Sequence, residues 1–259
     1  MPDVELKPQV YKDPRPKEYF DRFHARSRTR DPNAVYELVR IATMLHALIT
    51  FRARGLGAEN VPIGPVILAP NHASFMDHFF TGAFIRRRVR FMAKSQMFKP
   101  PFGPLVYSPG GVFPVRRGHH DEEAFVTSFE IIRRGGAIVM YCEGGRSRTG
   151  KLADTAKSGI GRLALQTGVP VVPVAILGSY QVRNWKRLSF PKVTVQYGTP
   201  MKLDLVERPT REQQQEAADL IYGRIRQLHS ELARIGHAAA RRQHRRAERP
   251  PATGGAAAL

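Results

Sequence analysis

Short apolar runs alternate with amphipathic stretches along the chain from residue 65 onward. The runs are rich in β-branched residues and are bounded by Gly, Pro or charged residues, as buried strands are. They are PVILAP (65–70), VRFMA (89–93), VFPV (112–115), AIVMYC (137–142), VPVVPVAIL (169–177) and KVTVQYG (192–198). Acidic residues at 121–123 begin a predicted helix that runs to about Arg134, and a further helix is expected over about 159–167. This alternation predicts an α/β fold.

The two ends of the chain have different patterns. Thr210 and Gln213 have the spacing of a capping box, and apolar residues then recur every three or four positions as far as Ile235, which predicts one long amphipathic helix. Residues 237–259 are rich in Ala, Arg, Pro and Gly, so a disordered basic tail is expected. Residues 1–33 lack a sustained period and predict an irregular basic arm.

The segment 34–51 reads AVYELVRIATMLHALITF and has helical periodicity. One narrow stripe of the predicted helix is polar, and the rest of the helix surface is apolar. The stripe consists of Tyr36, Arg40, Thr43 and Thr50. Two interpretations stay open: an amphipathic helix in a membrane interface, or a core helix packed on the domain. We take 34–58 as a membrane-associating segment and 59–236 as the catalytic domain.

The composition limits the kinds of molecule that the protein is expected to bind. The chain has 259 residues with 42% hydrophobic content, enough for one substantial core. Lys and Arg number 41 against 22 Asp and Glu, a net charge of +19, so an anionic partner is expected: nucleic acid, anionic lipid or a phosphorylated small molecule. The single Cys142 favours a reducing, cytoplasmic setting. No uncharged stretch approaches the ~20 residues that span a bilayer, so a peripheral or monotopic protein is expected.

The segment NHASFMD (71–77) follows one predicted strand and precedes a predicted helix. Turns at the carboxyl ends of strands form the ligand crevice of open α/β sheets. An imidazole there suits a general base, and Asp77, five residues after His72, can orient it. The alternative is an Asn-His pair that caps the helix beside an exposed Asp.

Two further predicted strands end in glycines and arginines. YCEGGRS (141–147) places Arg146 beside a glycine turn that lets backbone amides approach a ligand, and GVFPVRR (111–117) ends in Arg116 and Arg117. Each basic group taken alone is compatible with a solvated surface feature. Three strand ends that share this character are less easily explained as solvated surface.

Together these segments resemble the glycerolipid acyltransferases typified by lysophosphatidic acid acyltransferase. NHASFMD is similar to that family's His-x4-Asp block, VFPVRR to its second, EGGRS to its third and VVPVAI to its fourth, in the family's order over about residues 62–235. The resemblance implies a single acyltransferase domain of α/β class, with a central mixed sheet flanked by helices and an N-terminal amphipathic membrane-interface helix.

The resemblance also implies roles for individual residues. His72 and Asp77 are the catalytic dyad. The substrate-binding residues are Arg116, Glu143, Gly144, Arg146 and Ser147, with Lys94 and Arg117 as further phosphate-binding candidates. The chain departs from the family pattern at Gly145, where Thr is usual, and at Cys142, where Pro is frequent.

The resemblance implies substrates and a location as well. Acyl-CoA or acyl-carrier protein is the expected donor and a lysophospholipid the acceptor, with neither cofactor nor metal. An anionic lipid surface is the expected partner, at the cytoplasmic face of the cell membrane.

Three other functions fit parts of the sequence. The run GRSRTGK (145–151) matches most of a P-loop, but Leu152 stands where a magnesium-binding Ser or Thr is needed. A serine hydrolase lacks its Gly-x-Ser-x-Gly elbow. A basic nucleic-acid-binding protein stays as the alternative function, although it leaves the four blocks unexplained and nucleic acid is not the expected partner.

Overall fold

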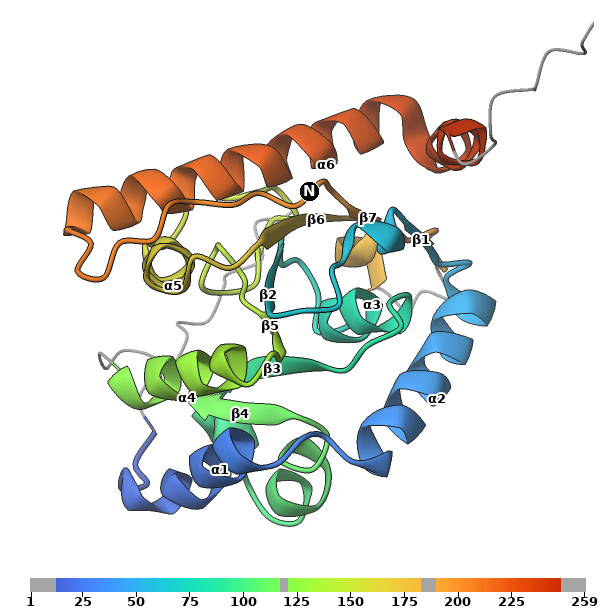
Figure 1. Cartoon of the computed structure of the whole chain (residues 1–259). Helices are drawn as coiled ribbons and strands as arrows, with labels where there is room; N and C mark the ends of the chain where they lie inside the picture. Colours follow the sequence, from blue (N-terminus) through green and yellow to red (C-terminus); the bar gives the residue numbers. More distant parts are fainter. Residues whose placement is uncertain (1–12, 117–120, 183–189, 248–259) are drawn as a thin grey trace, which may run out of the picture.

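The computed structural model describes residues 13–116, 121–182 and 190–247 (Figure 1). Its centre is a seven-stranded sheet in the order β1-β7-β6-β2-β5-β3-β4, in which only β6 and β7 pair antiparallel. The strands are β1 (Arg54–Leu56), β2 (Val66–Pro70), β3 (Val89–Lys94), β4 (Val112–Val115), β5 (Ala137–Val139), β6 (Val171–Leu177) and β7 (Thr194–Tyr197). The predicted mixed sheet flanked by helices is confirmed.

Helices cover both faces of this sheet. They are α1 (Glu18–Thr29), α2 (Ala34–Thr50), α3 (Asp77–Ala83), α4 (Glu122–Arg133), α5 (Gly159–Thr167) and α6 (Arg211–Ala247), with short turns η1 (Ala58–Asn60), η2 (Ser95–Met97) and η3 (Gly103–Tyr107). Successive residues of β2 alternate between the two apolar clusters. Val66 and Leu68 pack with α2 and α3, whereas Ile67 and Ala69 pack with α4, α5 and α6. A strand buried on both faces requires the continuous apolar run seen in the sequence.

The long C-terminal helix begins at the predicted capping box. The Thr210 amide donates to Gln213 Oε1 at 2.8 Å, and the Gln213 amide donates to Thr210 Oγ1 at 3.3 Å. Gly236, at φ 72° and ψ 166°, interrupts the helix, which then continues as far as Ala247. His237 Nδ1 lies 2.6 Å from Thr194 Oγ1 and connects this second part to β7. The prediction of a disordered tail from residue 237 is therefore wrong up to residue 247, and 248–259 lie outside the described residues.

The N-terminal segment is not an irregular arm. Helix α1 buries Phe20 and Phe23 against Phe98, and Tyr19 donates a hydrogen bond to the Phe98 carbonyl at 2.8 Å. The prediction failed because three aromatic residues among many charges give too weak a periodic signal in the sequence. In the folded chain a few buried rings are enough to hold the helix against a matching apolar surface. Residues 1–12 lie outside the described part of the chain.

Helix α2 packs on the sheet on one side and exposes apolar residues on the other. Its Tyr36 and Ala47 are buried in the core, and the strand after it, β1, pairs with β7, so the sheet begins before the predicted boundary at residue 59. The opposite side exposes large apolar side chains, with exposed fractions of 71% at Leu38 and 78% at Ile49. The structure has a helix over Ala34–Thr50, and the prediction of an amphipathic membrane-interface helix stays a prediction.

The contact between α5 and α6 gives a test of this packing. A Cβ added at Gly161 would lie 1.9 Å from the Gln214 carbonyl oxygen, whereas nothing lies within 4 Å of one added at Gly223. Gly161→Ala should therefore lower the free energy of unfolding by about 1–3 kcal/mol, measured by urea denaturation. The same change at Gly223 should raise it by about 0.5–1 kcal/mol. Equal effects at the two positions would contradict the close helix contact.

Candidate active site

The carboxyl ends of four parallel strands meet at one edge of the sheet. His72 follows β2, Glu143 follows β5, Lys94 ends β3 and Arg116 follows β4. Since β2, β5, β3 and β4 are adjacent and parallel, segments far apart in the sequence are brought side by side. The structure thus gathers the residues that the first three sequence blocks predicted.

His72 and Asp77 are in direct contact. His72 Nδ1 lies 2.9 Å from Asp77 Oδ2, and the same oxygen accepts hydrogen bonds from the amides of Ala73 and Ser74, each at 2.7 Å. A carboxylate only accepts, so Nδ1 carries a proton, and in the neutral imidazole Nε2 has the lone pair. Both side chains are buried, and the alternative of a capping pair beside an exposed Asp is wrong.

Asn71 attaches this turn to the neighbouring strand. Its amide nitrogen donates to the Ile176 carbonyl at 3.1 Å, and its amide oxygen accepts from the Ile176 nitrogen at 2.7 Å. The side chain thereby continues the β2–β6 pairing for one more residue. We did not predict this role, and an Asn directly after a buried strand was its only signal in the sequence.

Two further rings surround the His72 imidazole. Tyr141 stacks on it with ring centroids 3.9 Å apart and an interplanar angle of 23°, and His78 lies 5.2 Å away at 71°. His78 Nδ1 donates to the Phe75 carbonyl at 3.2 Å. Burial, and to a smaller extent the nearby His72, lowers the pKa of His78 to about 4, so His78 is neutral at pH 7. Sequence reasoning assigned no role to either ring.

Glu143 faces the backbone of His72. Its Oε1 accepts a hydrogen bond from the His72 amide at 3.1 Å. Burial raises the pKa of this carboxyl from 4.5 to about 7; the hydrogen bond opposes the shift and the charge of Asp77 adds to it. Glu143 therefore supports the His72 turn directly, and its predicted contact with an acceptor stays a prediction.

The glycine turn that follows Glu143 is closed by Ser147. Gly144 has φ 65°, a conformation that glycine adopts without strain. The Ser147 amide donates to the His72 carbonyl at 2.7 Å, while Ser147 Oγ donates to the Lys151 carbonyl at 2.6 Å and accepts from the Gly150 amide at 3.0 Å. The hydroxyl of Ser147 is thus occupied by its own loop.

The predicted phosphate-binding cations lie around this edge. Arg146 is next to Ser147, and Lys94 is exposed at the end of β3, in register with Val115 of β4. Arg116 is half-buried, and its Nε has no hydrogen-bond partner among the described residues. Arg117 lies outside the described residues. Of the four predicted cations, the described residues thus include Lys94 at the end of β3, Arg116 directly after β4 and Arg146 in the loop after β5.

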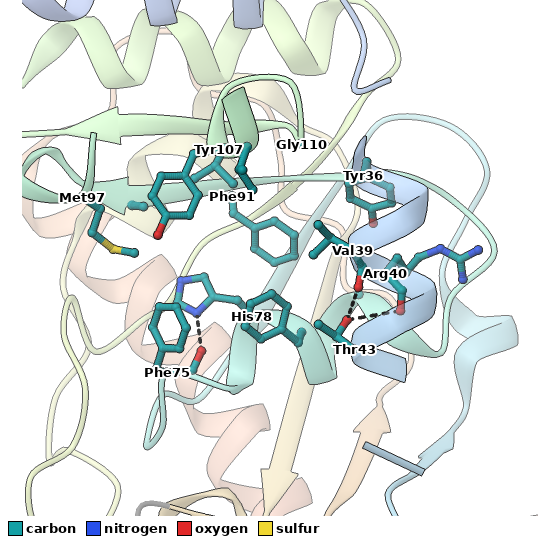
Figure 2. Close-up of a pocket in the computed structure, with 15 residues that line it drawn as sticks. Tyr36, Val39, Arg40, Thr43, Phe75, His78, Phe91, Met97, Tyr107 and Gly110 are labelled. Carbon is teal, nitrogen blue, oxygen red and sulfur yellow. Dashed lines mark hydrogen bonds between the residues drawn. The ribbon is translucent and has the colours of Figure 1, made fainter. Parts of the chain in front are cut away.

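An apolar cavity opens beside the dyad (Figure 2). Its walls come from α2, α3, β3 and the η3 region, and they include Val39, Phe75, Phe79, Phe91 and Val106. His78 lies between this cavity and His72, because it lines the first and contacts the second. The site therefore combines a buried imidazole, a cationic rim and an apolar chamber.

The chain is similar to known acyltransferases. Residues 53–177, which include both members of the dyad, match the family model described as Acyltransferase. A chloroplastic 1-acyl-sn-glycerol-3-phosphate acyltransferase of Brassica napus is 30% identical over 130 residues, covering 49% of this chain and 37% of that protein. The human 1-acyl-sn-glycerol-3-phosphate acyltransferase beta is 30% identical over 135 residues, 51% of this chain and 48% of that protein. The chain spans less than half the length of these relatives.

One solved structure has a similar fold. The crystal structure of the 1-acyl-sn-glycerophosphate acyltransferase PlsC from Thermotoga maritima superposes with a TM-score of 0.57, over 82% of this chain and 88% of that one. The sequence identity is 24%, so the similarity concerns the fold.

The raised pKa of Glu143 predicts a dependence of stability on pH. Between pH 4.5 and about 7 the folded state holds a proton that the unfolded chain releases, so this group's contribution to stability falls as pH rises through that range. Glu143→Gln should therefore lose less stability than the wild type between pH 5.5 and pH 8, measured by urea unfolding. Glu216→Gln, at an exposed position of α6, is the matched control. If the free energy of unfolding changes equally with pH in all three proteins, the raised pKa of Glu143 is contradicted.

Proposed function

We propose that the chain transfers a fatty acyl group from acyl-CoA or acyl-carrier protein to a hydroxyl of lysophosphatidic acid or a related phosphoglycerolipid, a reaction that its similarity to the Acyltransferase family model over residues 53–177 supports. The observation that carries the proposal is the hydrogen bond of 2.9 Å between His72 and Asp77 beside an apolar cavity. A general base, an orienting carboxylate and an apolar chamber are what acyl transfer to an alcohol requires.

The reaction is a direct transfer. His72 Nε2 removes the proton from the acceptor hydroxyl as its oxygen attacks the thioester carbonyl. The resulting tetrahedral oxyanion collapses and expels the thiolate, which takes the proton back from His72. Asp77 holds Nδ1 and stabilises the imidazolium that forms between these two steps.

An acyl-enzyme intermediate is not part of this proposal. Cys142 is buried, and burial raises the pKa of its thiol far above the usual range, so a thiolate is not formed. Ser147 Oγ donates its proton to the Lys151 carbonyl and is directed into its own loop. Neither side chain is therefore activated as a nucleophile.

The cationic rim is the proposed site of the acceptor phosphate. Arg146 is adjacent to Ser147, whose amide contacts the His72 carbonyl, and the buried Nε of Arg116 has a hydrogen bond left to donate within the described part of the chain. Planar guanidinium groups suit a two-point contact with a phosphate. Lys94 adds a point charge at the neighbouring strand end.

The acyl chain is assigned to the apolar cavity of Figure 2. Its walls of Phe75, Phe79 and Phe91 match a hydrocarbon chain, and His78, which contacts the proposed base, also lines it. A thioester whose chain fills the cavity would therefore present its carbonyl carbon near His72.

The same cavity connects the site to a proposed membrane surface. One of its walls is α2, whose outer side exposes Leu38, Ile41, Leu45 and Ile49, an arrangement that is unfavourable in water. None of the helices in residues 13–116, 121–182 and 190–247 is long and apolar enough to cross a bilayer. We therefore assign α2 to the surface of an anionic bilayer, at the cytoplasmic face of the membrane, where the +19 charge adds attraction.

The activity is tested by replacing the base. A labelled acyl-CoA or acyl-carrier protein is offered with glycerol phosphate, lysophosphatidate and other lysolipids, and label transfer is followed. His72→Ala should lower turnover by about 10²–10⁴-fold without unfolding the protein, because the base is lost. Asp77→Asn should also lose much of the rate, since an amide cannot stabilise the imidazolium. Near-normal turnover by His72→Ala, against a His229→Ala control on α6, would refute the mechanism.

Membrane association is tested with point variants, since Tyr36 and Ala47 of the same helix are part of the core. Replacing Leu38 and Ile49 together with Ser should weaken sedimentation with anionic vesicles by at least about 10-fold, because two apolar side chains no longer leave water. The control replaces Leu205 and Leu220, which are 62% and 52% exposed outside α2. If both double variants lose vesicle binding equally, or if duplex DNA displaces the protein from vesicles at fixed salt, the outer side of α2 is not the membrane-binding surface.

A further inference from the structure

The ring of Tyr141 lies flat against the proposed catalytic base. Tyr141 follows β5, and its carbonyl accepts a hydrogen bond from the Gly144 amide at 3.2 Å, which fixes the backbone beside His72. The two ring centroids are 3.9 Å apart with an interplanar angle of 23°. The phenol oxygen is buried and has no hydrogen-bond partner of normal geometry among the described residues. The ring, rather than the hydroxyl, therefore makes the contact that matters to His72.

Other groups contact His72 at its Nδ1 atom and at its backbone. Asp77 contacts the imidazole at Nδ1, and Glu143 contacts the His72 backbone. The ring of His78 is 5.2 Å away, and its Nδ1 donates a hydrogen bond to the Phe75 carbonyl. Because the pKa of His78 is lowered, this neighbour is neutral and brings no second positive charge. Arg146, by contrast, is a cation close enough to His78 to affect its charge. The face of the His72 ring is thus supported by Tyr141.

We propose that Tyr141 is a positioning residue whose aromatic face holds the His72 imidazole in place and stabilises its protonated form during acyl transfer. The inference rests on the proposed function. No bond is made or broken at Tyr141: the proton passes from the acceptor hydroxyl to His72 Nε2 and then to the leaving thiolate. A planar cation stacked on an aromatic face is attracted by the negative charge of that face, and the attraction is larger where water is excluded.

The stacked ring affects the neutral and the protonated form of His72 differently. The neutral imidazole present before reaction gains little from the ring beyond ordinary packing, whereas the imidazolium formed during attack gains the additional attraction. An interaction that strengthens only as the reaction proceeds changes kcat rather than KM. Removal of the hydroxyl alone leaves the ring and its effect in place.

The experiment compares Tyr141→Phe with Tyr141→Leu. The Phe variant should keep kcat within about 2-fold, because the stacked ring remains. The Leu variant should lower kcat by about 10-fold with KM for donor and acceptor nearly unchanged, and it should move the acid limb of the pH profile of kcat/KM to lower pH. Phe129→Leu on α4, a partly buried aromatic residue of the opposite cluster, is the control for a loss of packing alone and should leave the pH profile unchanged.

A second measurement does not depend on turnover. The NMR titration of His72 should have a lower midpoint in Tyr141→Leu than in the wild type, and Tyr141→Met replaces the Leu variant if that protein does not fold. A wild-type kcat and pH profile in the non-aromatic variants would overturn the inference while leaving the proposed function intact. If the wild type transfers no acyl group, the proposed function fails, and an unchanged His72 titration would then refute the stacking effect as well.

Discussion

The rest of the site depends on the buried carboxylate of Asp77. One of its oxygens receives hydrogen bonds from the His72 imidazole and from the amides of Ala73 and Ser74. Hydrogen bonds to an ionised group contribute about 1.5–3 kcal/mol each, and a buried carboxylate without them would be strongly destabilising. The turn between β2 and α3 therefore has little freedom to adopt another shape, and the ring of His72 is oriented by the same contacts that close the turn.

Hydrogen bonds to neighbouring strands also fix the turn that carries His72. Asn71 attaches the turn to β6 through Ile176, and the loop after β5 returns to it at the backbone of His72. Because Glu143 and Ser147 contact His72 through its backbone amide and carbonyl, the position of the base is defined without using its reactive nitrogen. These two contacts hold the backbone of His72, whereas Asp77 and Tyr141 hold its ring.

Helix α2 connects the site to its surroundings. The polar stripe read from the sequence does not face water: Tyr36 is buried and Thr43 lines the apolar cavity, whereas Leu38 and Ile49 point outward. This orientation is the reverse of an ordinary surface helix. The same helix thus forms a wall of the proposed acyl site and an exposed apolar surface, which links access to the cavity with the proposed membrane contact.

Local chemistry determined much of this protein from its sequence alone. The α/β class, the capping box at Thr210 and the spacing of His72 and Asp77 all follow from periods and contacts a few residues long. Prediction failed where a few residues depend on a distant partner. Helix α1 is an example, because Phe20 and Phe23 require the surface around Phe98 before their burial stabilises anything.

Only the tertiary structure decided which groups surround the base. Tyr141 reaches His72 because β2 and β5 are adjacent and parallel in register, and no pattern within either segment specifies that pairing. Burial, which raises the pKa of Glu143 and lowers that of His78, likewise arises from the packing of several elements. Hydrophobic periodicity is a property of one segment, whereas ring stacking and desolvation are properties of the space between segments, and that space exists only in the folded chain.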